Sequence, residues 1–481
     1  MSSPAGGQIS RDALRRMLIP LALAQFICSF AGSNMNVMIN DIKDDLNTTV
    51  QGVQVCITLF LLVMAALMIP CGKLTDRLGR KRCFQLGLAI YGVGAVLSAA
   101  APGLGILILG NSIFEGVGTA LLIPPVYILT TILFRDMKAR ARAFGVISGM
   151  GGIGAAMGPL IGGAITTAIS WRAAFVFQAI IIVVIVLLGR DITDPVPPDP
   201  TRPFDTVGAV LSAAGLVILV GGIMAADTNL ALMLVLLAVG LAILFGFYAW
   251  IRARERAGKE ALLSTALFKN RTSNLALVTQ NVQWQILLGT SFVVSTYLQV
   301  VRHYNAIQTG VIFTAATLGI LLSSLAAGRL ARRYAQRSLI MVGFVVTIVG
   351  IALLLVMVKG HPGAWYFAPG LFLIGTGLGV MLTPSVNVVQ SAFPEHLQGE
   401  ISGLSRSVSN LGSCLGTAIA GTILVAGITS TPERSYGLAM IALAVVGLIG
   451  LVASVFLPAV LASPAAARPP QQNPPRPVET T

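Results

Sequence analysis

The sequence predicts an all-α membrane protein with 14 transmembrane helices arranged 6+2+6. Hydrophobic residues make up 55% of its 481 residues, charged residues only 10%, and the mean hydropathy is +0.85. A soluble domain carries about 25% charged residues, so this chain is predicted to lie in a lipid bilayer. The positions of its apolar stretches and an internal repeat set the number and the grouping of the helices.

A membrane-crossing helix needs about 20 predominantly apolar residues. No Ala-x-Ala-like cleavage site follows the first such stretch, so we expect the first helix itself to begin insertion. The stretches that meet the length condition lie at residues 17–38, 53–71, 83–101, 105–131, 143–169, 172–189, 205–225, 229–251, 274–300, 308–328, 338–358, 365–390, 403–427 and 436–459.

The Lys and Arg residues are distributed unevenly over the predicted loops. With the N-terminus inside, 27 of the 32 lie on inner segments, divided as 3, 5, 4, 2, 6, 4, 1 and 2 from the first tail to the last. This bias predicts a multi-pass protein of the cell (inner) membrane with both termini in the cytoplasm. It also explains the net charge of +14 without nucleic acid as a partner. The outer loops hold the other 5, namely Lys43, Arg172, Arg302, Lys359 and Arg434.

Three segments recur later in the chain at a nearly constant offset. GKLTDRLGRKR at 72–82 is related to GRLARRYAQRS at 328–338, 256 residues further on. GVGTALLIPP at 116–125 resembles GLGVMLTPS at 377–385, and GAAMGPLIGG at 154–163 resembles GSCLGTAIAG at 412–421. The basic segment follows the second predicted helix and then the tenth. The chain therefore divides into six helices, two inserted helices and six more.

This division gives seven predicted segments. Pro and Asp residues exclude a membrane-embedded helix between the first six helices and the insertion, and the Pro-rich C-terminal end is predicted to be disordered. The segments are an N-terminal tail (1–16), a six-helix bundle (17–189), a Pro/Asp-rich linker (190–204), two inserted helices (205–251), a basic cytoplasmic loop (252–273), a second six-helix bundle (274–459) and a Pro-rich tail (460–481).

The segment GKLTDRLGRKR combines two glycines and one acid with five basic residues. Gly72 and Gly79 permit a tight turn between two helices. Asp76 can cap a helix or pair across the inner face. An ordinary basic loop that obeys the positive-inside rule is the alternative interpretation. The basic residues expected to face the cytoplasm include Arg77, Arg80, Lys81 and Arg82.

The fifth predicted helix contains a row of small residues in GMGGIGAAMGPLIGG, at 149–163. Such a row lets another helix backbone approach closely, and Pro159 removes a backbone hydrogen bond and bends the helix. Close packing alone is the simpler interpretation. In the second copy, Thr417 stands at the position of the proline. The small residues in the first copy are Gly151, Gly154, Gly158, Gly162 and Gly163.

These motifs resemble those of the major facilitator superfamily, and within it the fourteen-helix drug:proton antiporter branch, over essentially the whole membrane part. GKLTDRLGRKR resembles the superfamily's inner-loop motif, and GAAMGPLIGG resembles the helix-5 antiporter motif. FDTVGAVL and YLQVVRHYNAIQTG are also similar to that branch. The resemblance implies alternating access, a cavity between two six-helix halves, and export coupled to inward proton flow.

The resemblance also implies roles for particular residues. An inner gate would include Gly72, Asp76, Arg77, Gly79 and Arg80. The hinge of the fifth helix would be shaped by the antiporter motif, that is by Gly154, Gly158, Pro159, Gly162 and Gly163.

The sequence departs from that branch at three positions. Ala31 stands where the branch usually has an Asp in the first helix, and Ser112 stands where it usually has an Arg in the fourth. Glu115 replaces the usual Gln. The usual acid and base are both absent, and a new acid appears on the fourth helix. The proton-coupling residue of the branch therefore does not carry over.

Glu115 is the only charged residue of the segment 105–125. A charge at the centre of a membrane costs about 2.5–3.5 kcal/mol, and such residues face the bundle interior or a watery cavity. We expect Glu115 either to couple transport to protons or to pair with substrate. The alternative is a permanently protonated residue that hydrogen-bonds between helices, for example to Asn34 or Asn36.

Other polar residues lie within the predicted helices, and each either lines the cavity or packs against a neighbouring helix. Consecutive residues such as Gln283, Trp284 and Gln285 cannot all face one cavity. The candidates for lining the cavity are Asn34, Asn36, Ser112, Asn281, Gln285, Asn387 and Asn410.

The function that these features predict is secondary active export of amphiphilic organic compounds. The partners would be a small organic substrate, protons and the lipid bilayer, and the protein would act as a monomer. An exporter of a lipid, siderophore or metabolite, with or without proton coupling, and a non-transporting membrane sensor stay open as alternatives. No catalytic motif, cofactor motif or metal-ligand spacing of the five cysteines points to an enzyme.

Overall fold

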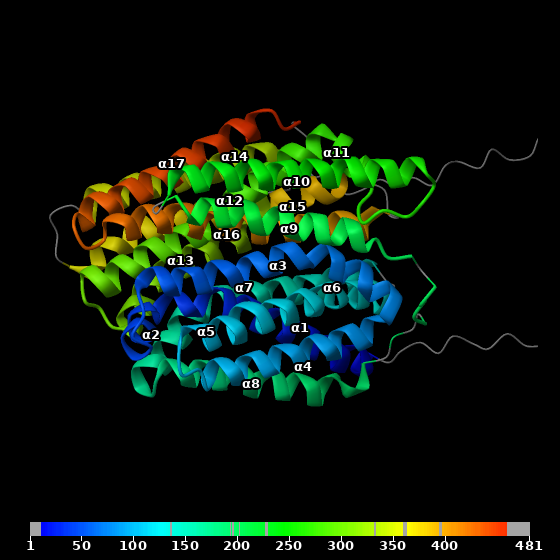
Figure 1. Ribbon diagram of the computed structural model, residues 1–481, viewed down its shortest axis with the longest axis horizontal. Helices are drawn as coiled ribbons and strands as arrows, with labels where there is room; N and C mark the ends of the chain where they lie inside the picture. Colours follow the sequence, from blue (N-terminus) through cyan, green and yellow to red (C-terminus); the bar gives the residue numbers. More distant parts are fainter. Residues whose placement is uncertain are drawn as a thin grey trace, which may run out of the picture.

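The computed structural model describes residues 11–134, 137–192, 194, 197–201, 203–226, 229–330, 333–358, 363–393 and 397–458. These residues form helices and no strand, and the long helices run side by side in one elongated bundle (Figure 1). Among them, 14 helical segments are long and apolar enough to cross a membrane. The predicted number of spans and their 6+2+6 arrangement are therefore confirmed.

The spans follow the predicted order. The first six are α1 (Arg11–Asn34), α3 (Val50–Leu78), α4 (Arg80–Ala99), the continuous segment α5 (Leu104–Leu107), η2 (Ile108–Glu115) and α6 (Gly116–Leu133), α7 (Met137–Ala168) and α8 (Trp171–Leu188). The inserted pair is α9 (Thr206–Met224) and α10 (Leu230–Arg256). The last six are α12 (Arg271–Thr296) with η4 (Tyr297–Val301), α13 (Ala306–Leu330), α14 (Gln336–Val358), α15 (Ala368–Ser391), α16 (Gln398–Gly427) and α17 (Pro432–Val455).

Short helices connect several spans. They are η1 (Met35–Val37), α2 (Ile39–Asp45), η3 (Gly189–Asp191), α11 (Ala266–Lys269) and η5 (Ala364–Phe367). We call the end of the bundle at which α1 begins the inner end, after the predicted topology.

Some predicted boundaries are shifted in the structure. Helix α10 continues to Arg256 and α12 begins at Arg271, so the connection predicted at 252–273 is shorter and contains α11. Helix α1 begins at Arg11, within the segment predicted as a tail. The predicted tail at 460–481 lies outside the described residues.

The two six-helix halves pack in the same way. Within the first half α1 packs along α7, and within the second half α12 packs along α16. Between the halves α7 meets α13 and α3 meets α16, so each half offers its second and fifth spans to the other. Two clusters of buried apolar side chains form the cores, and each lies mostly within one half. This pairing agrees with the internal repeat in the sequence.

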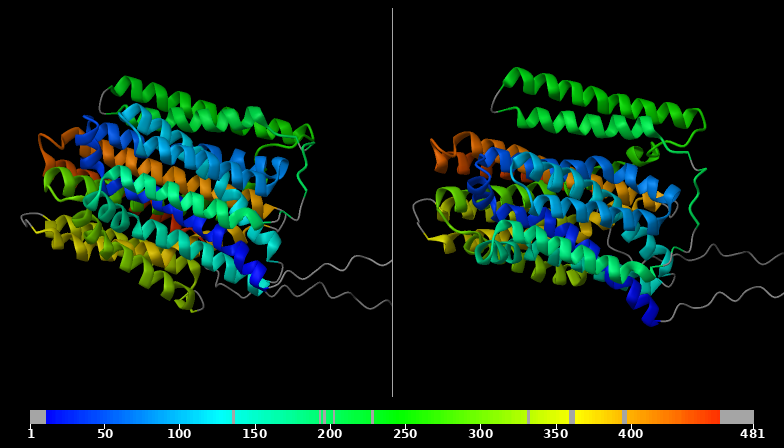
Figure 2. Two further views of the ribbon diagram at one scale, coloured as in Figure 1. Left: turned by 90° about the horizontal axis from the view of Figure 1, so that it is seen from below. Right: turned by 60° about the horizontal axis from the view of Figure 1, so that its bottom comes forward.

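The inserted helices lie on the outside of the bundle, as Figure 2 shows for the green pair. Helix α9 contacts α3 and α16, so it covers the line along which the two halves meet. Helix α10 packs mainly against α9, and much of its apolar surface is exposed, including Leu234, Leu241 and Phe245. Large exposed apolar side chains on a membrane helix face lipid.

Polar side chains cap the helices at the points where the sequence interrupts its apolar stretches. Each accepts a hydrogen bond from a backbone N–H of the first turn, which would otherwise be unpaired. The caps are Thr49 on α3, Ser170 on α8, Asp205 on α9, Asn229 on α10 and Asn270 on α12.

Candidate functional site

Glu115 is fully buried within the first half of the protein. Its Oε1 accepts a hydrogen bond of 3.3 Å from the hydroxyl of Ser98 on α4, and the side chain of Tyr91 also interacts with it. Its Oε2 is enclosed without a hydrogen-bond partner. The partners of this carboxyl lie on α4, and neither Asn34 nor Asn36 is among them. Glu115 therefore faces its own half and not the interface between the halves.

The helix that carries Glu115 is locally unwound into π-helical turns over η2. Gly94 and Gly110 allow α4 to approach this segment closely, because a Cβ at Gly110 would lie 2.6 Å from the Ser98 hydroxyl and 2.8 Å from the Gly94 carbonyl oxygen. This close approach brings Ser98 within reach of Glu115. π-Helical turns inside α-helices are frequent at functional sites. The hydropathy pattern of this span gives no sign of these π-helical turns.

Several residues predicted as cavity candidates pack within one half instead. The Ser112 hydroxyl donates to the Cys56 carbonyl at 2.8 Å, which joins η2 to α3. Asn281 donates to the Val408 carbonyl at 2.8 Å, and Gln285 donates to Asn281 at 2.6 Å, which together join α12 to α16.

Three further asparagines among the cavity candidates, Asn34, Asn387 and Asn410, have different surroundings. Asn34 is buried against Gly162 of α7, and its Nδ2 has no hydrogen-bond partner. Asn387 is exposed and Asn410 is half-buried.

Asn36 lies where the outer ends of the two halves meet. Its Nδ2 donates to the Ser291 hydroxyl of α12 at 3.3 Å, and its carbonyl accepts a hydrogen bond of 2.7 Å from Gln299 of η4. The Oε1 of Gln299 accepts from the backbone N–H of Asn40 at 3.2 Å. We call these four residues the outer junction. They connect the end of the first span to the end of the ninth.

A second polar contact orders the outer end of the first half. Asp45 on α2 accepts hydrogen bonds from Arg172 and, at 3.0 Å, from the indole of Trp171, both in the first turn of α8. The bond from Arg172 and the weaker one from Trp171 hold the pKa of Asp45 below its usual value, although partial burial opposes the shift.

The glycines of the antiporter motif face two different neighbours. Cβ atoms at Gly154, Gly158 and Gly162 would meet α1, at 2.3 Å from the Phe26 carbonyl oxygen in the case of Gly154. A Cβ at Gly163 would instead lie 2.4 Å from the carbonyl oxygen of Ala306 on α13. The glycines of the motif therefore do not all face the same helix. Most of the row packs α7 within its own half, and only Gly163 lies between the halves.

The face of α7 that meets α13 is closed in its outer part and open in its inner part. In the outer part, a Cβ at Gly310 of α13 would lie 2.3 Å from the Pro159 carbonyl oxygen of α7. The Thr317 hydroxyl of α13 donates a hydrogen bond of 2.9 Å to the Ala156 carbonyl of α7. The same face continues inward at intervals of three and four residues. The inner positions on this face are Gly152, Gly149 and Gly145, and a Cβ added at any of them would have no atom within 4 Å. Helices α7 and α13 thus separate toward the inner end.

The basic motif forms the turn between α3 and α4. Gly79 has φ +96°, a backbone conformation that residues with a side chain rarely adopt, so glycine is required there. Gly72 lies inside α3 and takes no part in the turn, which corrects the prediction for it. The carboxylate of Asp194, from the predicted linker, accepts hydrogen bonds from the backbone N–H groups of Arg80 at 2.7 Å and Lys81 at 3.4 Å. Sequence reasoning missed this cap of α4.

The charged residues of this turn pair locally. The guanidinium of Arg80 donates to Asp76 at 2.7 Å, four residues earlier. Arg80 is only 8% exposed, and its Nε and Nη1 are enclosed without partners, so it does not face solvent as predicted. Arg77 is exposed. The contact between the halves comes from another residue of the motif.

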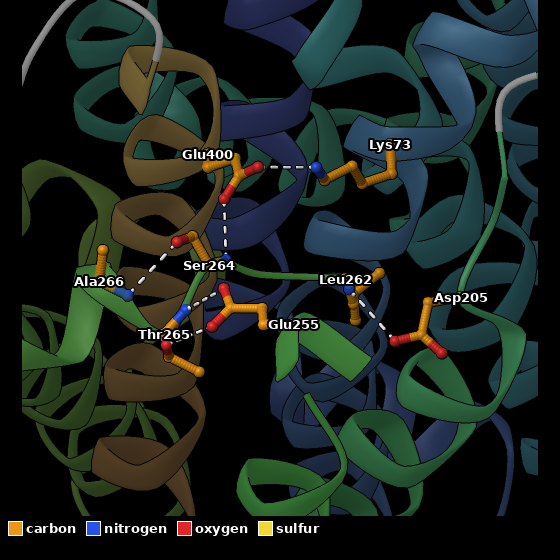
Figure 3. Close-up of polar contacts among 8 residues, drawn as sticks. All are labelled: Lys73, Asp205, Glu255, Leu262, Ser264, Thr265, Ala266 and Glu400. Atoms are coloured by element: carbon orange, nitrogen blue, oxygen red, sulfur yellow. Dashed lines mark hydrogen bonds and ion pairs between the residues drawn. The ribbon is translucent and has the colours of Figure 1, made fainter. Parts of the chain in front are cut away.

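Lys73 and Glu400 form an ion pair between the halves at the inner ends of α3 and α16. Their Nζ and Oε1 atoms are 2.7 Å apart (Figure 3). The Oε2 of Glu400 accepts a hydrogen bond of 2.9 Å from the backbone N–H of Ser264, which follows the inserted helices. Close by, Asp205 accepts from the Leu262 backbone at 3.2 Å, so the same loop is tied to the start of α9. The inserted pair is thus connected to the inner end of both halves.

Arg406 is a further residue that the sequence did not single out. The topology count assigned its charge to the last inner loop, but it lies within α16, six residues after Glu400 and about 9 Å further along the helix axis. Its guanidinium donates to the hydroxyl of Tyr127 on α6 and lies 4.7 Å from the centroid of that ring. Arg406 therefore reaches from the second half to the first. The polar run SRSVSN at 405–410 was the available signal.

Two apolar grooves lie away from these residues. A groove of about 350 Å³ runs between α4 and α8, and Gly92, Val96 and Ile182 are among its lining residues. A smaller one of about 280 Å³ lies beside it. Both are apolar and open on the surface that faces lipid, so neither is the expected cavity between the halves.

Comparison with known proteins identifies the family. The sequence profile of the Major Facilitator Superfamily matches residues 21–417. The chain belongs to the Major Facilitator Superfamily. The puromycin resistance protein of Streptomyces alboniger is 28% identical over 411 residues, which is 84% of this chain and 81% of that protein. The multidrug efflux pump LfrA of Mycolicibacterium smegmatis is 27% identical over 437 residues, 91% of this chain and 84% of that protein.

Two further transporters are similar at the level of sequence or fold. A riboflavin transporter of Clostridioides difficile is 26% identical over 407 residues, 84% of this chain and 86% of that protein. The crystal structure of a peptide transporter, POT, superposes with a TM-score of 0.67 at 16% identity and covers 91% of this chain and 94% of that one. This likeness confirms the fold of the superfamily.

Proposed function

We propose that this protein exports amphiphilic organic compounds across the cell membrane by alternating access. The observation that carries the proposal is the asymmetry of the α7–α13 contact, which is closed at its outer part and open at its inner part. The asymmetry belongs to the α7–α13 pair, because α3 and α16 stay joined at the inner end by Lys73 and Glu400. An alternating-access transporter must make and break such contacts between its halves at either end. The relatives named for puromycin resistance and multidrug efflux support a drug as substrate.

Proton antiport is the second part of the proposal, with Glu115 as the coupling residue. Among the described residues, no Lys, Arg or His nitrogen lies within 4 Å of its carboxyl. An unpaired charge there would be costly, so in this conformation Glu115 holds a proton. Because its enclosing contacts lie on α4, release of the proton requires α4 and η2 to move apart. That movement would link protonation to the conformation of the first half.

The proposed topology follows from the distribution of charge. The inner segments carry most of the Lys and Arg residues, which supports cytoplasmic termini and insertion in the inner membrane. We further propose that a single chain, which contains both halves of the transport path, functions as a monomer.

A drug-susceptibility panel tests the proposed export. We expect expression of the protein in an efflux-deficient bacterial host to raise the minimum inhibitory concentrations of several structurally unrelated amphiphilic antibiotics. The host with an empty vector is the control, and the amount of protein in the membrane is measured by immunoblot. If no compound becomes less toxic although the protein is inserted, drug export is contradicted.

The Lys73–Glu400 pair gives a prediction for the inner gate. Glu400→Gln removes the ion pair but still offers an oxygen to the Ser264 backbone. Both side chains are partly exposed, at 28% and 22%, so the pair contributes at most about 1 kcal/mol. Because the pair joins the inner ends of the halves, we expect its loss to lower the ratio of the inward-closed to the inward-open form by up to about five-fold. The initial rate of export should fall by a similar factor.

A double-mutant cycle separates this gate from general disturbance of the inner end. Lys73→Met alone, Glu400→Gln alone and the two together are compared for initial export rate at equal expression. If the residues act as a pair, the double variant is no slower than the slower single variant. Additive losses would show that the two residues act independently.

A further inference from the structure

Arg406 brings a positive charge to the interface between the two halves without an acidic partner. Among the described residues, no carboxylate oxygen lies within 4 Å of its guanidinium, and its partners are the neutral hydroxyl and ring of Tyr127. Charged residues at such depth in a membrane protein are expensive and are usually functional. A structural ion pair does not account for this one.

The guanidinium also retains hydrogen-bonding capacity. An arginine has five N–H donors, and the hydrogen bond to Tyr127 uses one of them. Arg406 is half-buried, and its Nε and Nη1 are not among the enclosed nitrogens that lack a partner, in contrast to those of Arg80. These two nitrogens of Arg406 are therefore not sealed inside the protein.

The residues around Arg406 add aromatic and polar groups to this charge. Tyr127 stacks on Phe144 of α7, with ring centroids 5.9 Å apart and an angle of 21° between the planes. The Tyr127 hydroxyl donates to the Oε1 of Gln25 on α1 at 3.2 Å. Phe144 adjoins Gly145, on the inner part of α7 where the face toward α13 is open. The group is therefore next to the open part of the interface.

We propose that Arg406, Tyr127, Phe144 and Gln25 form a binding site for an organic anion that carries an aromatic ring. The inference rests on the proposed function, because it names the class of substrate that enters from the inner side. A carboxylate, sulfonate or phosphate of the substrate takes the unused donors of Arg406, which suit a bidentate anion. The ring of the substrate packs against Tyr127 and Phe144. A cationic compound is repelled at the same place.

The test compares three fluorescent probes of the same shape and different charge: 1-pyrenebutanoate, its primary amide, and 1-pyrenebutylamine. Binding to the purified full-length protein is measured by fluorescence anisotropy in nanodiscs of zwitterionic lipid. We expect the carboxylate to bind at least about ten-fold more tightly than the amide, and the amine to bind least. Repetition with an anionic lipid shows whether headgroups compete for the same site.

Variants of Arg406 then assign the preference. In Arg406→Gln we expect the carboxylate and the amide to bind equally, while Arg406→Lys keeps part of the preference because it keeps the charge. Arg434→Gln is the control, because it removes an exposed arginine at the start of α17 that lies outside the proposed site. Thermal unfolding of each variant shows whether it folds.

Two outcomes would overturn the inference. One is equal binding of the three probes, or no binding of the carboxylate, by the unaltered protein. The other is an undiminished preference for the carboxylate in a folded Arg406→Gln variant. Failure of the susceptibility panel would instead contradict drug export, and a charge preference in binding would survive that result.

Discussion

Glu115→Gln is expected to abolish the response of export to a proton gradient while the protein still folds. Glutamine has nearly the same size and can still accept the hydrogen bond from Ser98, but it cannot release a proton. In proteoliposomes with an imposed gradient, we expect the initial rate of export to fall by at least about ten-fold, as for a lost coupling free energy of about 1.4 kcal/mol or more. The rate without a gradient should change little.

Two control variants make this result specific. Glu433→Gln removes an exposed carboxyl at the start of α17 and should leave the gradient response unchanged. Ser98→Ala removes the hydrogen bond that the Ser98 hydroxyl donates to the Glu115 carboxyl and should weaken the response without abolishing it. If Glu115→Gln retains the full response to the gradient, Glu115 is a structural residue and coupling lies elsewhere or is absent.

Gly163→Ala is expected to prevent closure of the outer end. The added Cβ would lie 2.4 Å from the Ala306 carbonyl oxygen and 2.9 Å from its carbon, which are backbone atoms of the other half. Helices α7 and α13 must therefore move apart there, at a cost of about 1–3 kcal/mol in this conformation. We expect this outward-closed conformation to become about five-fold to 150-fold less populated relative to the outward-open one, and export to slow accordingly.

Accessibility of the outer junction measures the effect. A single cysteine at Ser291, in a protein whose five native cysteines are replaced, should react faster with a membrane-impermeant maleimide when Gly163→Ala is present. Gly149→Ala is the matched control, because its Cβ would meet no atom within 4 Å on the same face of α7. Equal labelling with and without Gly163→Ala would show that the halves do not close at this contact.

Gly154→Ala separates this effect from damage to one half. Its Cβ would meet the Phe26 carbonyl oxygen of α1 at 2.3 Å, inside the first half. We expect it to lower thermal stability without raising the labelling of the outer junction.

The sequence by itself determined the number of spans, their grouping and the presence of a carboxyl inside the fourth. These features are local, because each apolar stretch meets the length requirement of the bilayer regardless of its neighbours. The repeat at 72–82 and 328–338 likewise placed the inserted pair without reference to tertiary contacts. The turn at Gly79 could be predicted for the same reason, since its conformation depends on adjacent residues.

Only the tertiary structure decided which neighbour each polar or small residue meets. Helical spacing puts Gly154 and Gly163 in one motif, but the rotation and crossing of α7 direct one to α1 and the other to α13. The same cause turns Glu115 toward α4 and carries Arg406 across to Tyr127. A hydropathy pattern shows that a residue is inside a span. Which helix packs beside it depends on contacts between residues far apart in the chain, because the lipid is as apolar as the side chains that face it.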